Sequence, residues 1–337
     1  MTWLALDIGG ANLKVADGLG YADSKSFPLW RKPQQLAGEV ARLLAAAPPA
    51  ERLAVTMTGE LADCFQSKAE GVRAILAAVV EAANGRETLV YLTDGQFASV
   101  DQACEQPLLA AASNWHALAQ FSTRFCKGQP GLLIDVGSTT VDLVPLSGGQ
   151  VSALGRNDPE RLVAGELVYT GVERSPICAI MPTLPWRGES CPVAQELFAT
   201  ALDAYLVLGE IAEDAQKRDT ADGRPATIQA AWDRLARMIC ADRTMFTRED
   251  ATRAARAVQA AQLDLLQRAA GRVIDRLPTP PSTIVLGGQG EFLARQLAER
   301  MKVDGKIVSL AKQLGAAASR CAPAHALAVL AREEWSR

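Results

Sequence analysis

Short apolar runs alternate with amphipathic segments along the first third of the chain. The runs at residues 3–7, 53–56 and 89–93 are typical of buried strands, and the segments 33–47 and 71–84 place apolar residues at helical spacing. A chain that alternates strands with helices builds a central sheet covered by helices. We therefore predict a mostly doubly wound α/β sheet in this region.

The opening pattern returns near the middle of the chain. The first apolar strand ends at Asp7 and leads into a glycine turn. A second apolar strand, residues 131–135, ends at Asp135 and leads into another glycine turn that is followed by hydroxyl residues. A supersecondary unit that recurs about one lobe later predicts two related lobes, each of which contributes one loop.

The length of the chain supports a division into two lobes. A chain of 337 residues exceeds the size of a single core, so we expect an N-terminal lobe at 1–128 and a C-terminal lobe at 129–337. A connector rich in Pro and Gly, residues 176–192, precedes a helical segment at 193–277. Helices are expected at 193–212, 227–242 and 250–277, and a strand with a glycine turn at 283–290.

The composition argues against several kinds of partner. The chain has 35 Lys and Arg against 38 Asp and Glu, a net charge of −3 and no basic stripe, so we expect no nucleic-acid partner. No apolar stretch reaches the ~20 residues of a membrane helix and no basic leader is visible, so we expect a cytoplasmic protein without a membrane partner. Seven scattered cysteines and two histidines argue against structural zinc and disulfides. A homodimer is left open.

The two glycine turns together have the chemistry of a phosphate site. Backbone N–H groups approach an anion closely where glycine removes the Cβ atom. Asp7 and Asp135, each at a strand end, are candidate catalytic groups and could hold Mg²⁺ through water. The other candidate contacts are Gly9, Gly10, Asn12 and Lys14 in the first loop and Gly137, Ser138, Thr139 and Thr140 in the second. One such turn is equally typical of an ordinary β-hairpin, so the prediction depends on the pair.

The order of these motifs resembles the superfamily of acetate and sugar kinases, heat-shock chaperones and actin. The resemblance implies a two-lobed, actin-like (ribonuclease H-like) α/β fold with central mixed sheets and a helical insertion. It also implies that residues 7–14 and 135–142 enclose phosphate groups and Mg²⁺, and that Gly287 and Gly288 form a nucleoside-side turn. The first loop lacks the hydroxyl residues that kinases offer there, which argues against ATP as the bound compound.

Several longer stretches resemble one family more closely. They read DIGGANLK at 7–14, PLWRK at 28–32, TMTGELADCF at 56–65, KAEG at 68–71, GELVYTGVER at 165–174, TADGRPAT at 220–227 and ARMICAD at 236–242. These stretches look like the hydantoinase/oxoprolinase-like family of tetrahydromethanopterin-linked one-carbon metabolism, whose archaeal members form the ether of the methanofuran precursor. The resemblance implies a transferase that releases pyrophosphate from an aminomethylfuran-methyl diphosphate. The acceptor would be the phenol of γ-glutamyltyramine or of a tyrosine-based analogue.

Such a reaction requires stabilisation of the leaving group and removal of the phenol proton. Lys14 and Arg31 are the candidate cations for the departing diphosphate. Asp135, Glu60 and Asp63 are the candidate general bases, in that order. Glu60 and Asp63 lie three residues apart, which predicts one face of a helix start directed toward the cleft. A helix cap with solvated charges is the alternative interpretation.

Three more charged residues are candidates for substrate binding. Arg31 and Lys32 follow an apolar turn and are predicted at the cleft mouth, with a solvated pair as the alternative. Lys68 precedes a helix, where an ion pair with Glu70 is the competing explanation. Arg174 is expected to close the cleft from the second lobe.

Two other functions fit the same fold. An ATP-dependent small-molecule kinase or hydrolase would keep the usual nucleotide of the superfamily, and a non-catalytic sensing module would bind a ligand without reaction. The family-like stretches favour the ether-forming transferase over both.

Overall fold

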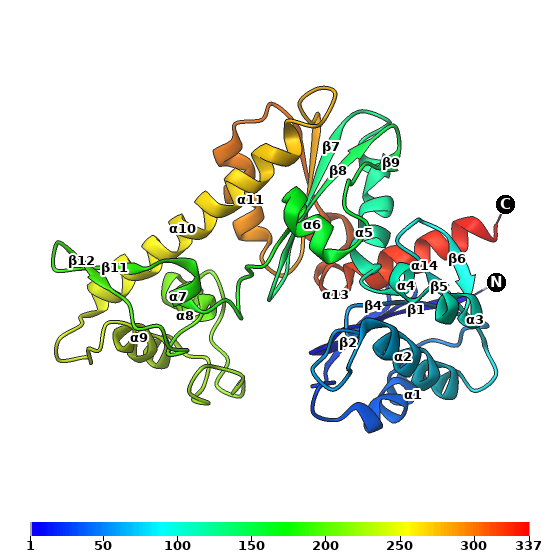
Figure 1. Ribbon diagram of the computed structural model, residues 1–337, viewed down its shortest axis with the longest axis horizontal. Helices are drawn as coiled ribbons and strands as arrows, with labels where there is room; N and C mark the ends of the chain where they lie inside the picture. Colours follow the sequence, from blue (N-terminus) through cyan, green and yellow to red (C-terminus); the bar gives the residue numbers. More distant parts are fainter. Residues whose placement is uncertain (1, 337) are drawn as a thin grey trace.

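The computed structural model describes residues 2–336 and builds two lobes, each on its own sheet (Figure 1). The first sheet has the order β3-β2-β1-β4-β5-β6. Its strands are β1 (Trp3–Ile8), β2 (Asn12–Ala16), β3 (Ala22–Ser26), β4 (Arg52–Met57), β5 (Glu87–Tyr91) and β6 (Phe97–Ser99). β1 pairs antiparallel with β2 and parallel with β4, so the sheet is mixed. The three strands predicted from apolar runs are confirmed as β1, β4 and β5.

The second sheet has the order β10-β8-β7-β13-β14, with β9 paired to β8. Its strands are β7 (Gly131–Val136), β8 (Val141–Ser147), β9 (Gln150–Val151), β10 (Leu167–Val168), β13 (Thr283–Gly287) and β14 (Lys306–Ser309). β7 pairs antiparallel with β8 and parallel with β13. The hairpin followed by a parallel neighbour repeats the arrangement of the first sheet. The predicted two-lobed actin-like fold with mixed sheets is therefore confirmed.

Helices cover both sheets. In the first lobe they are α1 (Leu36–Ala46), α2 (Lys68–Ala83), α3 (Val100–Glu105), α4 (Pro107–Ala110) and α5 (Asn114–Ser122), with 3-10 turns at Pro33–Gln35 and Thr123–Phe125. The later helices are α6 (Asp158–Ala164), α7 (Ile177–Ile180), α8 (Ala201–Leu208), α9 (Ile228–Arg237), α10 (Arg248–Ile274), α11 (Glu291–Met301), α12 (Leu310–Leu314), α13 (Ala316–Arg320) and α14 (Ala322–Glu334). Within residues 2–336, every helix is too short or too polar to span a lipid bilayer.

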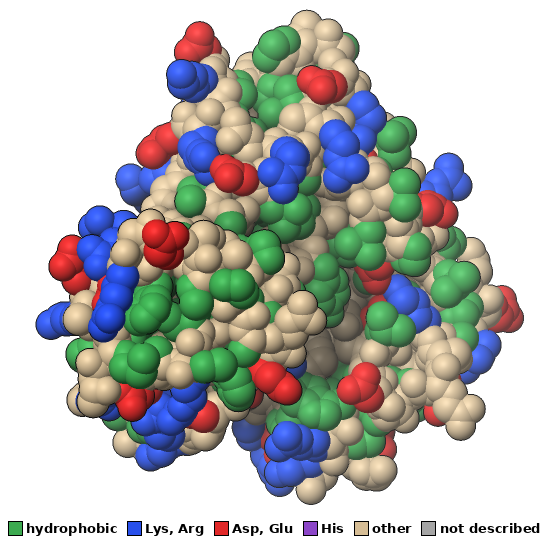
Figure 2. Space-filling model, turned by 60° about the vertical axis from the view of Figure 1, so that its left-hand side comes forward, with side chains coloured by type: hydrophobic (Ala, Val, Ile, Leu, Met, Phe, Trp, Pro, Cys, Tyr) green, Lys and Arg blue, Asp and Glu red, His purple; other side chains and the backbone are tan. Residues whose placement is uncertain are grey.

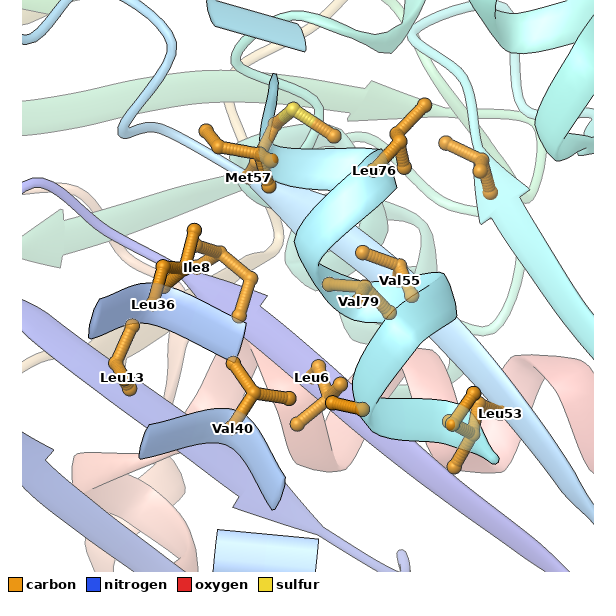
Figure 3. Close-up of a cluster of buried hydrophobic side chains, with 14 of the residues drawn as sticks. Leu6, Ile8, Leu13, Leu36, Val40, Leu53, Val55, Met57, Leu76 and Val79 are labelled. Atoms are coloured by element: carbon orange, nitrogen blue, oxygen red, sulfur yellow. The ribbon is translucent and has the colours of Figure 1, made fainter. Parts of the chain in front are cut away.

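The lobes share one layer of helices. One face of the first sheet is buried by α1 and α2, where Leu6 and Val55 of the sheet meet Val40 and Val79 (Figure 3). The opposite face packs against α5 and α14, and the same two helices also pack against the second sheet. The C-terminal helix therefore returns to the first lobe and lies between the two sheets. The expected lobe boundary at residue 128 stays a prediction.

The first helix predicted in the helical segment is shorter than expected at both ends. A helix was expected over 193–212, but the structure has a helix only at α8, because residues 193–200 form an irregular stretch that leads into the Thr200 cap and Gly209 ends the helix in a left-handed conformation. The connector at 176–192 contains α7 and a hairpin of β11 (Thr183–Trp186) and β12 (Glu189–Pro192). The predicted helices at 227–242 and 250–277 are confirmed as α9 and α10. α10 carries this segment away from the second sheet (Figure 1).

Candidate functional site

A cleft of about 660 Å³ lies between the two glycine-turn hairpins. In the space-filling view a hollow opens near the centre of the molecule, and positive and negative side chains are intermixed around that face (Figure 2). The predicted site residues that line the cleft are Gly9, Gly10, Asn12, Lys14, Arg31, Glu60, Asp63, Asp135, Gly137, Ser138, Thr139, Thr140, Arg174 and Gly288. Asp7, Lys32, Lys68 and Gly287 lie outside the lining.

Both hairpins are closed by the same turn. The Gly9 N–H donates to the carbonyl of Asn12 at 2.9 Å, and the Gly137 N–H donates to the carbonyl of Thr140 at 2.9 Å. A Cβ atom on Gly9 would lie 2.9 Å from the Asn12 oxygen, so the first turn requires glycine at this position. The two copies of the sequence pattern therefore have the same backbone structure, and both loops border one cleft.

The first hairpin holds a carboxylate with its own cation. The β1–β2 register places Lys14 opposite Asp7. Lys14 Nζ donates to Asp7 Oδ2 at 3.0 Å, and Asp7 is 1% exposed. Burial acts to lower the pKa of Lys14, but the negative charges of Asp7 and Asp135 outweigh it and raise the pKa. Lys14 therefore stays cationic at the edge of the cleft.

The second hairpin places two carboxylates opposite each other. The β7–β8 register pairs Asp135 with Asp142. Asp135 Oδ1 is buried without a hydrogen-bond partner. Burial raises the pKa of Asp135 to about 7, the charges of Asp142 and Asp7 add to the rise, and Lys14 opposes it. Asp135 therefore takes up or releases a proton near neutral pH.

Asp142 is stabilised by an arginine that the sequence did not single out. Arg161, from α6, is 1% exposed and donates through Nη2 to Asp142 Oδ1 at 2.7 Å. Its guanidinium carbon lies 3.8 Å from the centroid of the Trp115 ring, a cation–π contact. All three residues line the cleft. The sequence held one clue that Asp142 needs a cation: Asp142 occupies the position in the second loop that Lys14 occupies in the first.

The late glycine turn packs directly against the second hairpin. A Cβ atom on Gly287 would lie 2.9 Å from Asp135 Oδ1, and one on Gly288 would lie 2.2 Å from the carbonyl oxygen of Val136. Gly288 also has a φ angle of +82°, which favours glycine. These residues are glycines because β7 and Asp135 leave no space for a side chain. A role as a nucleoside-side turn stays a prediction.

The second loop is supported from behind by residues 170–175. A Cβ atom on Gly171 would lie 2.5 Å from the backbone of Ser138, so the two segments touch. The Glu173 and Arg174 amides both donate to the Ser138 carbonyl at 3.0 Å. This contact fixes the loop that carries the hydroxyl residues.

A buried polar network connects that support to α10. Gln262 is fully buried and donates to Thr170 Oγ1 at 2.7 Å and to the Gly171 carbonyl at 3.1 Å. The Tyr205 hydroxyl donates to Gln262 Oε1 at 2.7 Å, and Ser175 Oγ accepts from the Gly171 amide at 2.8 Å. Each polar side-chain atom of this hydrogen-bonded network has a partner. The network therefore holds the helical segment and the second loop in one geometry.

Glu60 enters the cleft from the first lobe, but not on a helix. The prediction that Glu60 and Asp63 share one face of a helix start is wrong, because residues 58–67 form turns and α2 begins only at Lys68. Glu60 is 2% exposed, whereas Asp63 is solvent-exposed.

Lys68 pairs with Asp158 at 2.6 Å and approaches Glu60 Oε1 only to 3.7 Å. The Lys68–Asp158 pair joins the two lobes, and an ion pair with Glu70 does not form.

The turn predicted for Arg31 and Lys32 forms, but only Arg31 lines the cleft, and Lys32 fits the alternative of a solvated residue. The Arg31 and Lys32 amides both donate to the carbonyl of Pro28, and both side chains are exposed. The Arg174 guanidinium lies 5.6 Å from the centroid of the Trp30 ring, so the two lobes meet at the mouth through a cation–π contact.

A family model described as hydantoinase/oxoprolinase matches residues 51–334. The chain belongs to the hydantoinase/oxoprolinase family. A relative in Methanocaldococcus jannaschii, named (4-{4-[2-(gamma-L-glutamylamino)ethyl]phenoxymethyl}furan-2-yl)methanamine synthase, is 31% identical over 337 residues, 99% of this chain and 98% of its own. A relative of the same name in Methanococcus vannielii is 27% identical over 60% of this chain and 91% of its own.

Solved structures support the fold of this hydantoinase/oxoprolinase-family chain. The nucleotide-free structure of acetone carboxylase aligns with a TM-score of 0.53 and 14% identity, covering 88% of this chain and 49% of that longer one. At this identity the likeness concerns the fold alone.

The residues of the family member suit a hydrated Mg²⁺ ion. Asp7 Oδ1 and Asp135 Oδ1 are both buried without a hydrogen-bond partner. Within residues 2–336, no group of three or more carboxylate, imidazole or thiolate ligands gathers at one point. Mg²⁺ commonly uses one or two carboxylates and completes its shell with water and substrate phosphates. The two free carboxylate oxygens meet that requirement.

Proposed function

We propose that this chain is a synthase that forms a furfuryl aryl ether in methanofuran biosynthesis. It joins an aminomethylfuran-methyl diphosphate to the phenol of γ-glutamyltyramine, or of a tyrosine-based analogue, and releases pyrophosphate. The observation that carries the proposal is the end-to-end relationship at 31% identity to a protein named as the synthase of such an ether.

The geometry of the cleft supports a diphosphate as the leaving group. The two loop turns present glycine backbone to a common space, and Lys14 and Arg31 border it. In the reaction the phenol oxygen bonds to the furfuryl carbon, and the bond from that carbon to the diphosphate oxygen breaks. The electron pair leaves with pyrophosphate, so negative charge grows where loop amides and Lys14 lie.

The phenol proton passes to a carboxylate of the cleft. Asp135, Glu60 and Asp63 all border the cleft. Asp135 is first among them because it is a buried carboxylate with an unpaired oxygen at the end of β7. A carboxylate at this place can accept a proton from a phenol that is losing it to bond formation.

Mg²⁺ would be held by Asp7 and Asp135 together with substrate phosphates, and would neutralise charge on the diphosphate when bound. Lys14 keeps Asp7 oriented through the 3.0 Å ion pair. Arg174 and Trp30 close the mouth above the substrates and limit the access of water that would hydrolyse the donor.

The test is an assay of pyrophosphate release with the synthetic furan diphosphate and γ-glutamyltyramine, with and without ATP. We expect the ether and pyrophosphate to form in equal amounts without ATP, because the first loop lacks the hydroxyl residues of a kinase. Substrate-dependent formation of ADP at saturating Mg²⁺-ATP, with no ether formed, would replace this proposal by a kinase.

A further inference from the structure

One carboxylate of the cleft is buried without a counterion of its own. Glu60 is 2% exposed, and its Oε2 atom has no hydrogen-bond partner although the residue lines the cleft. A buried carboxylate without a full partner is costly, and such a group marks a place where a ligand supplies the missing donor.

The position of Glu60 is fixed next to the first loop. The amides of Thr58 and Gly59 both donate to the carbonyl of Ile8, which joins the turn after β4 to the end of β1. A Cβ atom on Gly71 would lie 2.1 Å from the Glu60 carbonyl oxygen, so α2 presses directly on the Glu60 backbone. Glu60 therefore faces the cleft from a rigid support beside the phosphate loops.

Lys68 only partly balances the charge of Glu60. Lys68 Nζ lies 2.6 Å from Asp158 Oδ2 and 3.7 Å from Glu60 Oε1, so its main partner is in the other lobe. Burial raises the pKa of Glu60 to about 7. Backbone hydrogen bonds from Glu60 and Ala112 and the charge of Lys68 oppose the rise, and the charge of Asp158 adds to it. A second cation brought to Oε2 would stabilise the charged form.

The other carboxylates that line the cleft are less suited to receive a cation. Asp142 is paired with Arg161, and Asp158 is paired with Lys68. Asp63 and Asp219 are exposed, where water weakens an ion pair. Asp135 lies between the phosphate loops, at the place that the diphosphate and Mg²⁺ would occupy. Glu60 is a buried carboxylate outside that place, and its Oε2 atom has no partner.

We infer that Glu60 binds the primary ammonium group of the aminomethylfuran donor. The inference rests on the proposed function, since the product named for the relative carries a methanamine on its furan ring. A primary alkyl ammonium is charged at neutral pH and has three donors, as a lysine does. With the diphosphate in the glycine loops and the ammonium at Glu60, the furan ring spans the cleft and its reacting carbon is fixed.

The test compares two donors. One is the aminomethylfuran-methyl diphosphate, and the other is the same compound with methyl in place of aminomethyl. We expect the wild type to favour the first in kcat/KM by roughly 10- to 100-fold, the value of a charge-assisted hydrogen bond. Glu60→Gln should bring this ratio close to 1. Glu81→Gln removes an exposed carboxylate of α2 that does not line the cleft and should keep the wild-type ratio.

Each outcome separates this inference from the alternatives. If Glu60 is the general base, Glu60→Gln lowers turnover with both donors and leaves the ratio at its wild-type value, which overturns the inference. A wild-type ratio near 1 overturns it as well. If the wild type still releases pyrophosphate from both donors, either of these two results contradicts only the role of Glu60 and not the proposed function.

A binding measurement covers the case in which no donor reacts. If the wild type releases pyrophosphate from neither compound, the proposed function fails, and furfurylamine becomes the probe. Saturation-transfer NMR should show furfurylamine bound to the wild type and not to Glu60→Gln, with both proteins folded by thermal melting. Equal signals from the two proteins would overturn the ammonium site.

Discussion

The two hairpins at the cleft share a backbone and differ in charge. Each pairs an aspartate at the end of one strand with a charged residue on the next, and each closes with a 2.9 Å turn hydrogen bond. In the first hairpin that partner is Lys14, which neutralises Asp7. In the second it is Asp142, so Asp135 faces a like charge in place of a cation.

This difference in charge suits the first hairpin to binding a phosphate and the second to accepting a proton. A carboxylate paired with a lysine keeps its charge and orients the cation, whereas a carboxylate beside another carboxylate is easily protonated. Arg161 supports Asp142 and leaves Asp135 without a cation of its own in the second hairpin. One backbone unit, used twice, thus provides a cation at one loop and a titratable group at the other.

The largest expected effect tests whether both loops are needed. Asp7→Ala and Asp135→Ala should each lower turnover by at least ~100-fold, as loss of one strong electrostatic stabiliser does. Steady-state rates of pyrophosphate release with thermal melting as the folding control measure this, and excess Mg²⁺ should not restore activity. The double variant of Asp7→Ala with Lys14→Met should be no slower than Asp7→Ala alone, because the pair acts as a unit. Near-normal turnover in either single variant would refute the two-loop site.

A second test concerns the cations on the leaving group. Lys14→Met and Arg31→Met should lower kcat by roughly 10- to 100-fold and change KM less, because a contact that strengthens as charge develops affects turnover. Lys306→Met, on exposed β14 away from the cleft, is the matched control and should behave as the wild type. An unaltered kcat with a weaker KM would show that the cations bind only the ground-state diphosphate.

A third test targets the buried polar network behind the second loop. Gln262→Leu leaves the Tyr205 hydroxyl unpaired in the interior and removes one of the two hydrogen bonds of Thr170 Oγ1, so it should destabilise the fold by about 1–3 kcal/mol. The melting temperature should fall by roughly 2–4 °C per kcal/mol. Gln259→Leu on the same helix is the control, because its buried Nε2 has no partner to lose. Equal melting of the two variants would contradict the network.

The smallest effect is a dependence of stability on pH. Burial raises the folded-state pKa of Asp135 to about 7, above its ordinary value of 3.8, so its contribution is fully present below about pH 4 and is lost as pH rises through 7. Asp135→Asn should therefore melt a few degrees above the wild type at pH 8 and close to it at pH 4, both in EDTA. The same difference at both pH values would show that Asp135 is not protonated in the folded protein.

Part of the site was available from the sequence. The repeated pattern of apolar strand, aspartate and glycine turn predicted both hairpins, because strand periodicity and turn chemistry are local properties. Most of the loop residues that it singled out line one cleft. The helix expected over residues 193–212 forms only at 201–208, because Thr200 caps its start and Gly209 ends it.

Other features depended on contacts between distant segments. Arg161 reaches Asp142 over a loop, Lys68 pairs with Asp158 in the other lobe, and Gln262 bonds to Thr170 from α10. No spacing in the chain encodes these pairs, since each partner is chosen by the packing of whole elements. The free Oε2 atom of Glu60 also depends on such contacts, because α2 packs on the Glu60 backbone and Lys68 pairs more closely with Asp158 than with Glu60. The sequence by itself determined where charged groups follow strands, and the tertiary structure decided which of those charges are neutralised.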